Sequence, residues 1–232
     1  IGQDLVSLID PAGKDRGRSS GPLLAPLGSL VGTMSLPEQQ AALPVIERFL
    51  EDRRRSLRGL ALLGLRGAGK TTLGRLLAER HGLPFVSVTR EIEQRAGMRL
   101  ADLFNLGGAE AYRSLENEVI VDLTRRQDRM ILETAGGIVG NSQALGVILS
   151  SFKTVWLKAS PEEHLARVAR QGDMRPMRGN PKALEHLKAL LAAREPDYAR
   201  AETTIDTSGR PIEACVADLE RIAAHIIARD AA

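Results

Sequence analysis

Residues 59–72 read Gly-Leu-Ala-Leu-Leu-Gly-Leu-Arg-Gly-Ala-Gly-Lys-Thr-Thr, and this stretch decides the fold. Residues 59–63 are apolar enough for a buried strand, and residues 64–71 match the pattern G-x-x-x-x-G-K-[ST]. In this pattern the glycines let backbone N–H groups curl around phosphate groups, and the next helix adds the positive end of its dipole. We therefore predict a phosphate-binding loop between a strand and a helix.

Two side chains of this loop carry specific chemistry. Lys70 is expected to neutralise the β- and γ-phosphates, and Thr71 to offer its hydroxyl to Mg²⁺. The residues predicted to bind the nucleotide are Gly64, Gly67, Ala68, Gly69, Lys70, Thr71 and Thr72. The pattern specifies phosphate and not one molecule, so ATP and the phosphorylated ADP portion of coenzyme A both fit. ATP and Mg²⁺ are the candidate cofactors.

Short apolar segments alternate with longer amphipathic segments from residue 57 onward. The predicted strands are Gly59–Leu63, Pro84–Val88, Arg129–Glu133, Lys153–Lys158 and Thr203–Asp206. The predicted helices include Lys70–His81, Ala109–Arg126, Pro161–Arg170, Pro181–Arg194 and Pro211–Ala228. This alternation is typical of a parallel sheet covered by helices on both faces. We predict a three-layer α/β fold, a P-loop fold of the nucleoside-kinase type.

The chain is predicted to have three regions. Residues 1–33 show no helical or strand period and are interpreted as a linker or the remnant of an upstream domain. Residues 34–56 are expected to form a connecting helix region, with Ser35 as the N-cap and Pro44 as a kink or break. Residues 57–232 form the P-loop domain. Because the chain begins at Ile1 and not at Met, we expect that an upstream domain has been left off.

Composition argues against several classes of protein. Aromatic residues make up 3% of the 232 residues and the formal charge is +3, which does not indicate a nucleic-acid surface. The single cysteine, Cys215, excludes an internal disulfide and suits a reducing compartment, so a cytoplasmic location is expected. No apolar run is long enough for a membrane span. The four histidines are expected at surfaces or helix ends: His81, His164, His186 and His225.

Several short motifs follow the loop at separated positions. They are Arg90–Glu93, Leu103-Phe104, Tyr112-Arg113 with Glu116, Arg175-Pro176, Arg194, Tyr198, and Thr204–Thr207 followed by Pro211. Together they resemble the shikimate kinases, small P-loop kinases that phosphorylate shikimate with ATP. The resemblance extends over about Leu57 to Ile227, so it covers the whole predicted P-loop domain.

The resemblance implies roles for particular residues. Arg113 and Arg194 would hold the substrate carboxylate, Arg167 would stack on adenine, and Arg175 would bring a mobile lid onto ATP. If the domain is a kinase, Lys70 and Arg175 are the candidate catalytic residues. The residues implied to contact the second ligand are Ser87, Thr89, Phe104, Tyr112, Arg113, Gly136, Gly137 and Arg194.

The chain departs from the family pattern after its second predicted strand. The kinases carry Asp-x-Asp there, one aspartate supporting Mg²⁺ and the reacting hydroxyl and the other gripping substrate hydroxyls, whereas this chain has Ser87 and Thr89. Hydrogen bonds to a charged group contribute about 1.5–3 kcal/mol each. A carboxylate that assists proton transfer contributes ~10²–10⁴ in rate. Ala135 also replaces the first residue of a Gly-Gly-Gly loop. We therefore predict that efficient shikimate phosphorylation is lost.

A narrower resemblance lies in residues 156–164 and 171–177, which are similar to the C-terminal domains of benzoyl-CoA-responsive transcriptional regulators of the BoxR/BzdR type. In that family a helix-turn-helix domain binds DNA and a kinase-like domain binds the aromatic CoA thioester. We predict an effector-binding domain of a transcriptional regulator of aromatic-compound degradation. Its ligand would be benzoyl-CoA, and DNA would be bound through a missing N-terminal domain.

Two alternatives remain open at this point. One is a divergent shikimate kinase that transfers the ATP γ-phosphoryl group to a small alcohol, and the other is an ATP-binding interaction module. The missing Asp-x-Asp at Ser87 and Thr89 counts against the kinase. No membrane partner is expected, and a homodimer is left open.

Overall fold

The structure is a computed structural model that describes residues 29–126, 128–170 and 182–227. The chain divides into two units, residues 1–56 and residues 57–232, and each is described by itself. The second unit contains the sheet and all of the hollows described below. The bounds of its strands and helices therefore determine where functional groups lie.

The first unit contains helix α3 (Leu36–Ser56), whose start agrees with the predicted cap. The backbone N–H and the Oγ of Ser35 both donate to Glu38 Oε2 at 2.7 Å. This contact is one half of a capping box. Pro44 lies inside the helix and does not end it, so the expected break there is wrong. Pro44 and Gln40 are both exposed, which leaves the Gln40 carbonyl open to water in place of the missing N–H donor.

The second unit is built on one five-stranded parallel sheet in the order β2-β3-β1-β4-β5. The strands are β1 (Gly59–Leu63), β2 (Phe85–Ser87), β3 (Met130–Glu133), β4 (Lys153–Lys158) and β5 (Thr203–Asp206). All five overlap the predicted strands. The predicted α/β fold with a parallel sheet is therefore confirmed.

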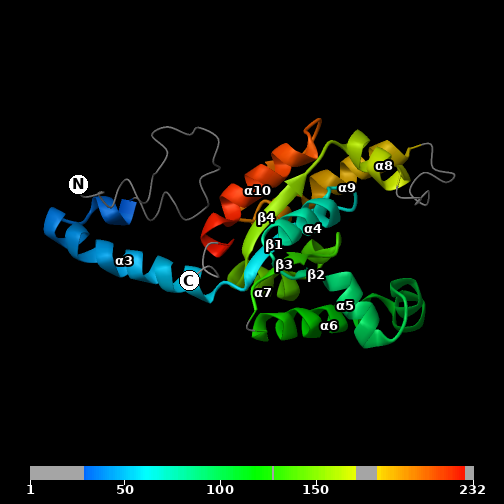
Figure 1. The fold of residues 1–232 in the computed structure, drawn as a ribbon, viewed down its shortest axis with the longest axis horizontal. Helices are drawn as coiled ribbons and strands as arrows, with labels where there is room; N and C mark the ends of the chain where they lie inside the picture. The colour runs from blue at the N-terminus through cyan, green and yellow to red at the C-terminus, as the bar shows by residue number, and fades with distance from the viewer. Residues whose placement is uncertain (1–28, 127, 171–181, 228–232) are drawn as a thin grey trace. The chain divides into compact units, whose positions relative to one another are not determined.

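Helices cover both faces of the sheet (Figure 1). They are α4 (Lys70–Arg80), α5 (Val88–Ala96), α6 (Leu100–Arg125), the 3-10 turn η1 (Ile138–Gly140), α7 (Ser142–Ser151), α8 (Pro161–Arg170), α9 (Ala183–Tyr198) and α10 (Ile212–Ile227). Along β1, Leu60 and Leu62 join a core with α4 and α10, while Ala61 and Leu63 join a core with α5, α6 and α7. This alternation follows from the two-residue period of a strand.

Helix α6 consists of two helical segments that meet at a kink. At the kink Gly108 has a φ of 68° and a ψ of −170°, which are not helical and which glycine adopts without strain. The segment after Gly108 agrees with the helix predicted from Ala109, whereas the segment that begins at Leu100 is not predicted. This additional segment places Phe104 in the same element as Tyr112.

The parallel arrangement places the functional groups at one edge. The carboxyl ends of β1, β2 and β3 lie side by side, because Ser87 pairs in register with Glu133 and Leu62 also pairs with Glu133. In open parallel sheets ligands bind beyond the carboxyl ends of the strands. The loop after β1 and the ends of β2 and β3 therefore meet at the edge where a ligand would bind.

Truncating the core should destabilise the second unit far more than truncating an exposed leucine. Leu60 is 0% exposed and Leu106 is 79% exposed. We expect Leu60→Ala to lower the free energy of unfolding by about 2–5 kcal/mol, because it leaves a cavity between the sheet and its helices. Leu106→Ala should change it by less than about 0.5 kcal/mol. Urea denaturation measures both, and equal losses would contradict the described core.

Candidate active site

Close contacts shape the loop between β1 and α4 at two of its glycines. Gly64 has φ +140°, and a Cβ there would lie 2.5 Å from the Leu157 carbonyl oxygen. Gly67 has φ +84°, and a Cβ there would lie 2.9 Å from the His164 carbonyl oxygen. Only glycine adopts this backbone without strain and without a clash. The loop is thus held against β4 and α8 in the curved form that phosphate binding requires.

Lys70 is held inside this loop. Lys70 is only 7% exposed, and its Nζ donates to the carbonyl oxygens of Gly64 at 2.7 Å and Leu65 at 3.2 Å. Burial lowers the pKa of Lys70 to about 8; the Glu133 carboxylate acts in the opposite direction, and Arg66 lowers it further. The ammonium is therefore mainly charged at neutral pH and is positioned to meet nucleotide phosphates.

One carboxylate of this site belongs to none of the sequence motifs quoted above. Glu133, the last residue of β3, accepts a hydrogen bond through Oε1 from Thr71 Oγ1 in the first turn of α4. Because Glu133 pairs in register with Ser87 and Leu62, these three side chains share one face of the sheet. A hydroxyl and a carboxylate therefore lie together next to Lys70.

A cleft of about 610 Å³ opens beside the loop on the β2 side. The predicted site residues that line it are Gly67, Gly69, Lys70, Thr71, Thr72, Ser87, Thr89, Phe104, Tyr112, Gly136 and Gly137. Arg90, Glu93 and Glu133 also line it. The rings of Phe104 and Tyr112 stack with their centroids 4.7 Å apart, forming an aromatic wall. The cleft is thus lined by the phosphate-binding loop, by the ends of the strands and by the stacked pair of aromatic rings.

A buried carboxylate positions the aromatic wall. Glu116 is 1% exposed; it accepts hydrogen bonds from the Tyr112 hydroxyl at 2.8 Å and from Asn141 Nδ2 at 3.0 Å. Burial raises the pKa of the Tyr112 hydroxyl, and the Glu116 charge adds to that effect. Asn141 also accepts the Ala144 N–H at the start of α7. Arg113 is exposed on α6 and is not among the described residues that line the cleft.

The glycine loop after β3 is held by residues of α9. Arg194 Nη1 donates to the Gly136 carbonyl oxygen at 3.2 Å, and the Tyr198 hydroxyl donates to the same oxygen at 2.6 Å. Tyr198 is fully buried and stacks on Trp156, with ring centroids 5.7 Å apart. The half-buried Arg194 therefore reaches the loop that forms one side of the cleft.

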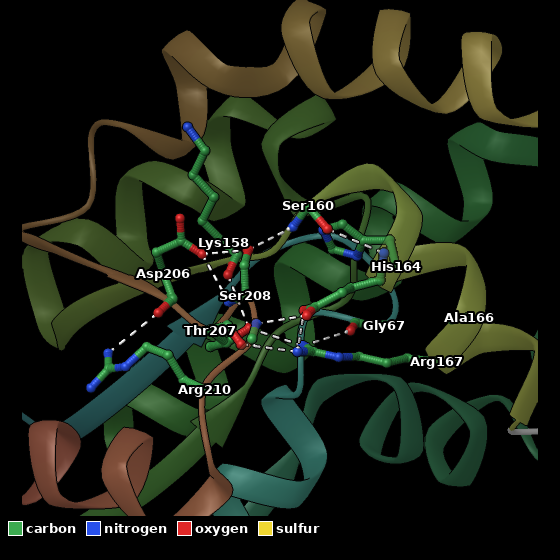
Figure 2. Close-up of polar contacts among 12 residues, drawn as sticks. Gly67, Lys158, Ser160, His164, Ala166, Arg167, Asp206, Thr207, Ser208 and Arg210 are labelled. Carbon is green, nitrogen blue, oxygen red and sulfur yellow. Dashed lines mark hydrogen bonds and ion pairs between the residues drawn. The ribbon is translucent and has the colours of Figure 1, made fainter.

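A second hollow of about 450 Å³ lies on the other side of the phosphate-binding loop. Figure 2 shows Arg167 of α8 reaching toward Thr207 and Gly67. Arg167 donates to Thr207 Oγ1 at 2.9 Å, to the Thr207 carbonyl oxygen at 3.0 Å and to the Gly67 carbonyl oxygen at 3.5 Å. It also pairs with Glu163 at 2.6 Å. Arg167 and Ala68 therefore lie in a hollow that borders the loop.

His164 lies in the first turn of α8, which agrees with a position at a helix end but not with a position at the surface. This residue of α8 is 2% exposed, and its Nδ1 lies 2.9 Å from the Arg66 carbonyl oxygen, so it links α8 to the phosphate-binding loop. Burial lowers the pKa of His164, which favours the neutral ring. The amphipathic period of α8 turns one face toward the loop, and His164 lies on that face. Arg175, predicted to act in a lid, lies outside the described residues.

The donor set beside the loop suits Mg²⁺. Thr71 and Glu133 offer hydroxyl and carboxylate oxygens, the hard ligands that this ion prefers. Among the described residues no group of three or more His, Cys, Asp and Glu side chains could hold a metal by itself. Bound phosphates would therefore have to complete the coordination. Within the same part of the chain, no helix is long and apolar enough to cross a membrane.

Comparison with known proteins decides the family. A family model described as shikimate kinase matches residues 66–229. The shikimate kinase of Symbiobacterium thermophilum is 39% identical over 162 residues, 69% of this chain and 92% of that protein. A shikimate kinase of Thermus thermophilus is 35% identical over 173 residues, 74% of this chain and 94% of that protein. The chain belongs to the shikimate kinase family.

Solved structures agree with this membership. The shikimate kinase from Acinetobacter baumannii in complex with shikimate has a TM-score of 0.64 and 31% identity, over 72% of this chain and 93% of that chain. The shikimate kinase from Aquifex aeolicus has a TM-score of 0.57 and 28% identity, over 69% of this chain and 92% of that chain. Both likenesses cover about 70% of this chain, so the fold is shared over most of its length.

Family membership contradicts the predicted effector-binding domain of a transcriptional regulator. The relatives that match most of the chain are named shikimate kinases, and none of those compared above is named for benzoyl-CoA, DNA or transcription. The narrower BoxR/BzdR resemblance, with benzoyl-CoA as ligand and DNA as partner, is therefore withdrawn. That prediction weighed the missing carboxylates at Ser87 and Thr89. It did not foresee that Glu133 on the adjacent strand brings a carboxylate to the same corner.

Nucleotide binding should weaken as Lys70 loses its proton. Bound phosphates favour the charged ammonium and so raise its pKa above the value of about 8 in the free protein. Binding then takes up a proton, and affinity for ADP should fall by up to about tenfold per pH unit above that value. Isothermal titration between about pH 7 and about pH 9.5 measures the fall.

The matched control is Lys70→Arg, which keeps its charge throughout this range. Its affinity for ADP should stay level while that of the unaltered protein declines. A decline of the same size in both proteins would assign the pH dependence to another group.

Proposed function

We propose that this chain is an ATP-dependent kinase that transfers the γ-phosphoryl group to a hydroxyl of shikimate. The support is membership of the shikimate kinase family together with the polar cleft beside the phosphate-binding loop. A solved relative with 31% identity holds shikimate. The proposal takes the reaction and the acceptor from these relatives and assigns residues from this structure.

The observation that carries the proposal is that two hollows meet at one loop. Gly67, Gly69 and Thr72 line both the cleft and the hollow beside Arg167. A nucleotide with its base beside Arg167 would direct its phosphates along the loop toward the cleft. The terminal phosphate would then face an acceptor in the cleft, and positioning of this kind is the main requirement of phosphoryl transfer.

The cleft offers partners for an acceptor that carries hydroxyl and carboxylate groups. Ser87 and Thr89 supply hydroxyls that both donate and accept hydrogen bonds. Arg90 lines the cleft, and Arg194 reaches its glycine loop, so a carboxylate would find a guanidinium there. Shikimate, a carboxylic acid with several hydroxyls, fits this set of partners.

The loop supplies the groups that act on the phosphates. Lys70 would neutralise charge on the transferred group, and the backbone N–H groups at the start of α4 would hold the phosphate oxygens. Thr71 would offer its hydroxyl to Mg²⁺, as the sequence predicts. When bound with the nucleotide, that ion would neutralise charge on the phosphates.

A direct assay tests the reaction. With ATP, Mg²⁺ and shikimate, we expect ADP to form in proportion to shikimate, and ³¹P NMR should show a phosphate monoester. Lys70→Met should lower kcat/KM by about 100-fold or more, because it removes a charge aimed at the phosphates. ADP that forms with a different small alcohol, but not with shikimate, would refute shikimate as the acceptor. If neither acceptor supports ADP formation, the kinase itself is refuted.

Single substitutions can test whether Arg194 or Arg113 binds the carboxylate of shikimate. A hydrogen bond to a charged group contributes about 1.5–3 kcal/mol, so we expect Arg194→Ala to raise KM for shikimate by about 10- to 150-fold. KM for ATP should change much less. Arg113→Ala, an exposed residue of α6, is measured in parallel because family resemblance gives it the same role. If KM for shikimate is unchanged in Arg194→Ala, Arg194 is not a carboxylate partner.

A further inference from the structure

We infer that Glu133 is a metal-positioning residue of this site, holding the Thr71 hydroxyl toward Mg²⁺ and supplying the negative charge that faces the ion. The inference rests on the proposed function, because it needs a nucleotide and Mg²⁺ at the loop. It goes beyond that function by assigning the carboxylate that the end of β2, with Ser87, does not carry.

The sheet register places Glu133 for this role. It is the last residue of β3, directly beside Ser87 of β2 and Leu62 of β1 in the parallel pairing. Its side chain lies on the face of α4, and Thr71 in the first turn of that helix donates to it. The contact joins residues 62 positions apart in sequence, so only the folded sheet creates it.

The hydrogen bond determines how the threonine can act. A hydroxyl has one proton and two acceptor lone pairs. With its proton donated to Glu133, Thr71 keeps its lone pairs free, and those lone pairs are what a metal ion needs. Partners that orient a metal ligand in this way usually affect metal affinity by about 10- to 100-fold. Mg²⁺ bound to nucleotides is also commonly held through one or two carboxylates together with phosphate oxygens.

The other carboxylate of the cleft is committed elsewhere. Glu93 Oε1 accepts the Leu100 N–H at 2.9 Å, which caps the start of α6. Glu133 instead lies against the loop, where its charge also stabilises the ammonium of the buried Lys70. Among the described residues that line the cleft, Glu133 is therefore the carboxylate placed to act on a metal at Thr71.

Calorimetric titration of ADP with and without Mg²⁺ tests the inference without any acceptor. In the unaltered protein Mg²⁺ should increase affinity for ADP. Glu133→Gln should reduce that increase by about 10- to 100-fold, because the isosteric amide lacks the charge. Affinity for ADP without Mg²⁺ should stay the same or rise, since a negative charge near the phosphates is gone. Glu202→Gln is the matched control: its carboxylate pairs with Lys153 at 2.7 Å outside the cleft, and the variant should keep the full increase.

A double-mutant cycle separates positioning from general loss of structure. Thr71→Val removes the hydroxyl with little change of shape and should also reduce the Mg²⁺-dependent increase. The cycle pairs it with Glu133→Ala, which removes both the charge and the oxygen that accepts the Thr71 hydroxyl. If Glu133 acts through Thr71, the double variant should lose little more than the more damaging single change. Additive losses would refute positioning through Thr71.

The outcomes distinguish this inference from the proposed function. A full Mg²⁺-dependent increase in Glu133→Gln, or none in the unaltered protein, would overturn the role of Glu133. If the increase is lost in Glu133→Gln but the unaltered protein does not phosphorylate shikimate, the metal role stands and the proposed function fails. Mn²⁺ binding followed by electron paramagnetic resonance gives a second readout that is independent of activity.

Discussion

Parallel pairing of β3 with β2 and β1 is the constraint on which the candidate site depends. It brings the ends of three strands to one edge and sets Glu133 beside Ser87 and Leu62. A shift of one residue in this register would turn Glu133 toward the opposite core. The same pairing holds the loop after β1 in front of those strand ends. The positions of the loop, of the Glu133 carboxylate and of the cleft therefore all depend on how β3 pairs with its two neighbours.

Opposing electrostatic effects act on the charge of Lys70 in the loop. Burial of Lys70 disfavours its charge, while Glu133 and the carbonyl oxygens of Gly64 and Leu65 support it. The ammonium is therefore partly satisfied by the protein before any phosphate binds. A ligand that carries negative charge would replace those carbonyl contacts with a stronger partner. Glu133 accepts a hydrogen bond from Thr71, and its charge also favours the ammonium form of Lys70. One carboxylate therefore acts on both side chains of the loop.

Much of the fold could be predicted because its pattern is local. Apolar runs such as residues 59–63 and 153–158 are strands in the structure, and the glycine-rich pattern marks the loop between β1 and α4. The missed contacts are those between distant segments. Glu116 of α6 is buried and accepts a hydrogen bond from Asn141, 25 positions further along the chain. His164 contacts the loop across 98 positions, which no spacing in the sequence reveals.

The sequence by itself determined the class of fold, the phosphate-binding loop and the motifs that resemble the shikimate kinases, because each depends on residues close together in the chain. At Ser87 the sequence favours the wrong function, because a carboxylate that is absent from one strand can be supplied by its neighbour. Only the tertiary structure placed Glu133 at that corner. The physical reason is that the sheet combines side chains by register between strands, and register is decided when the strands pair.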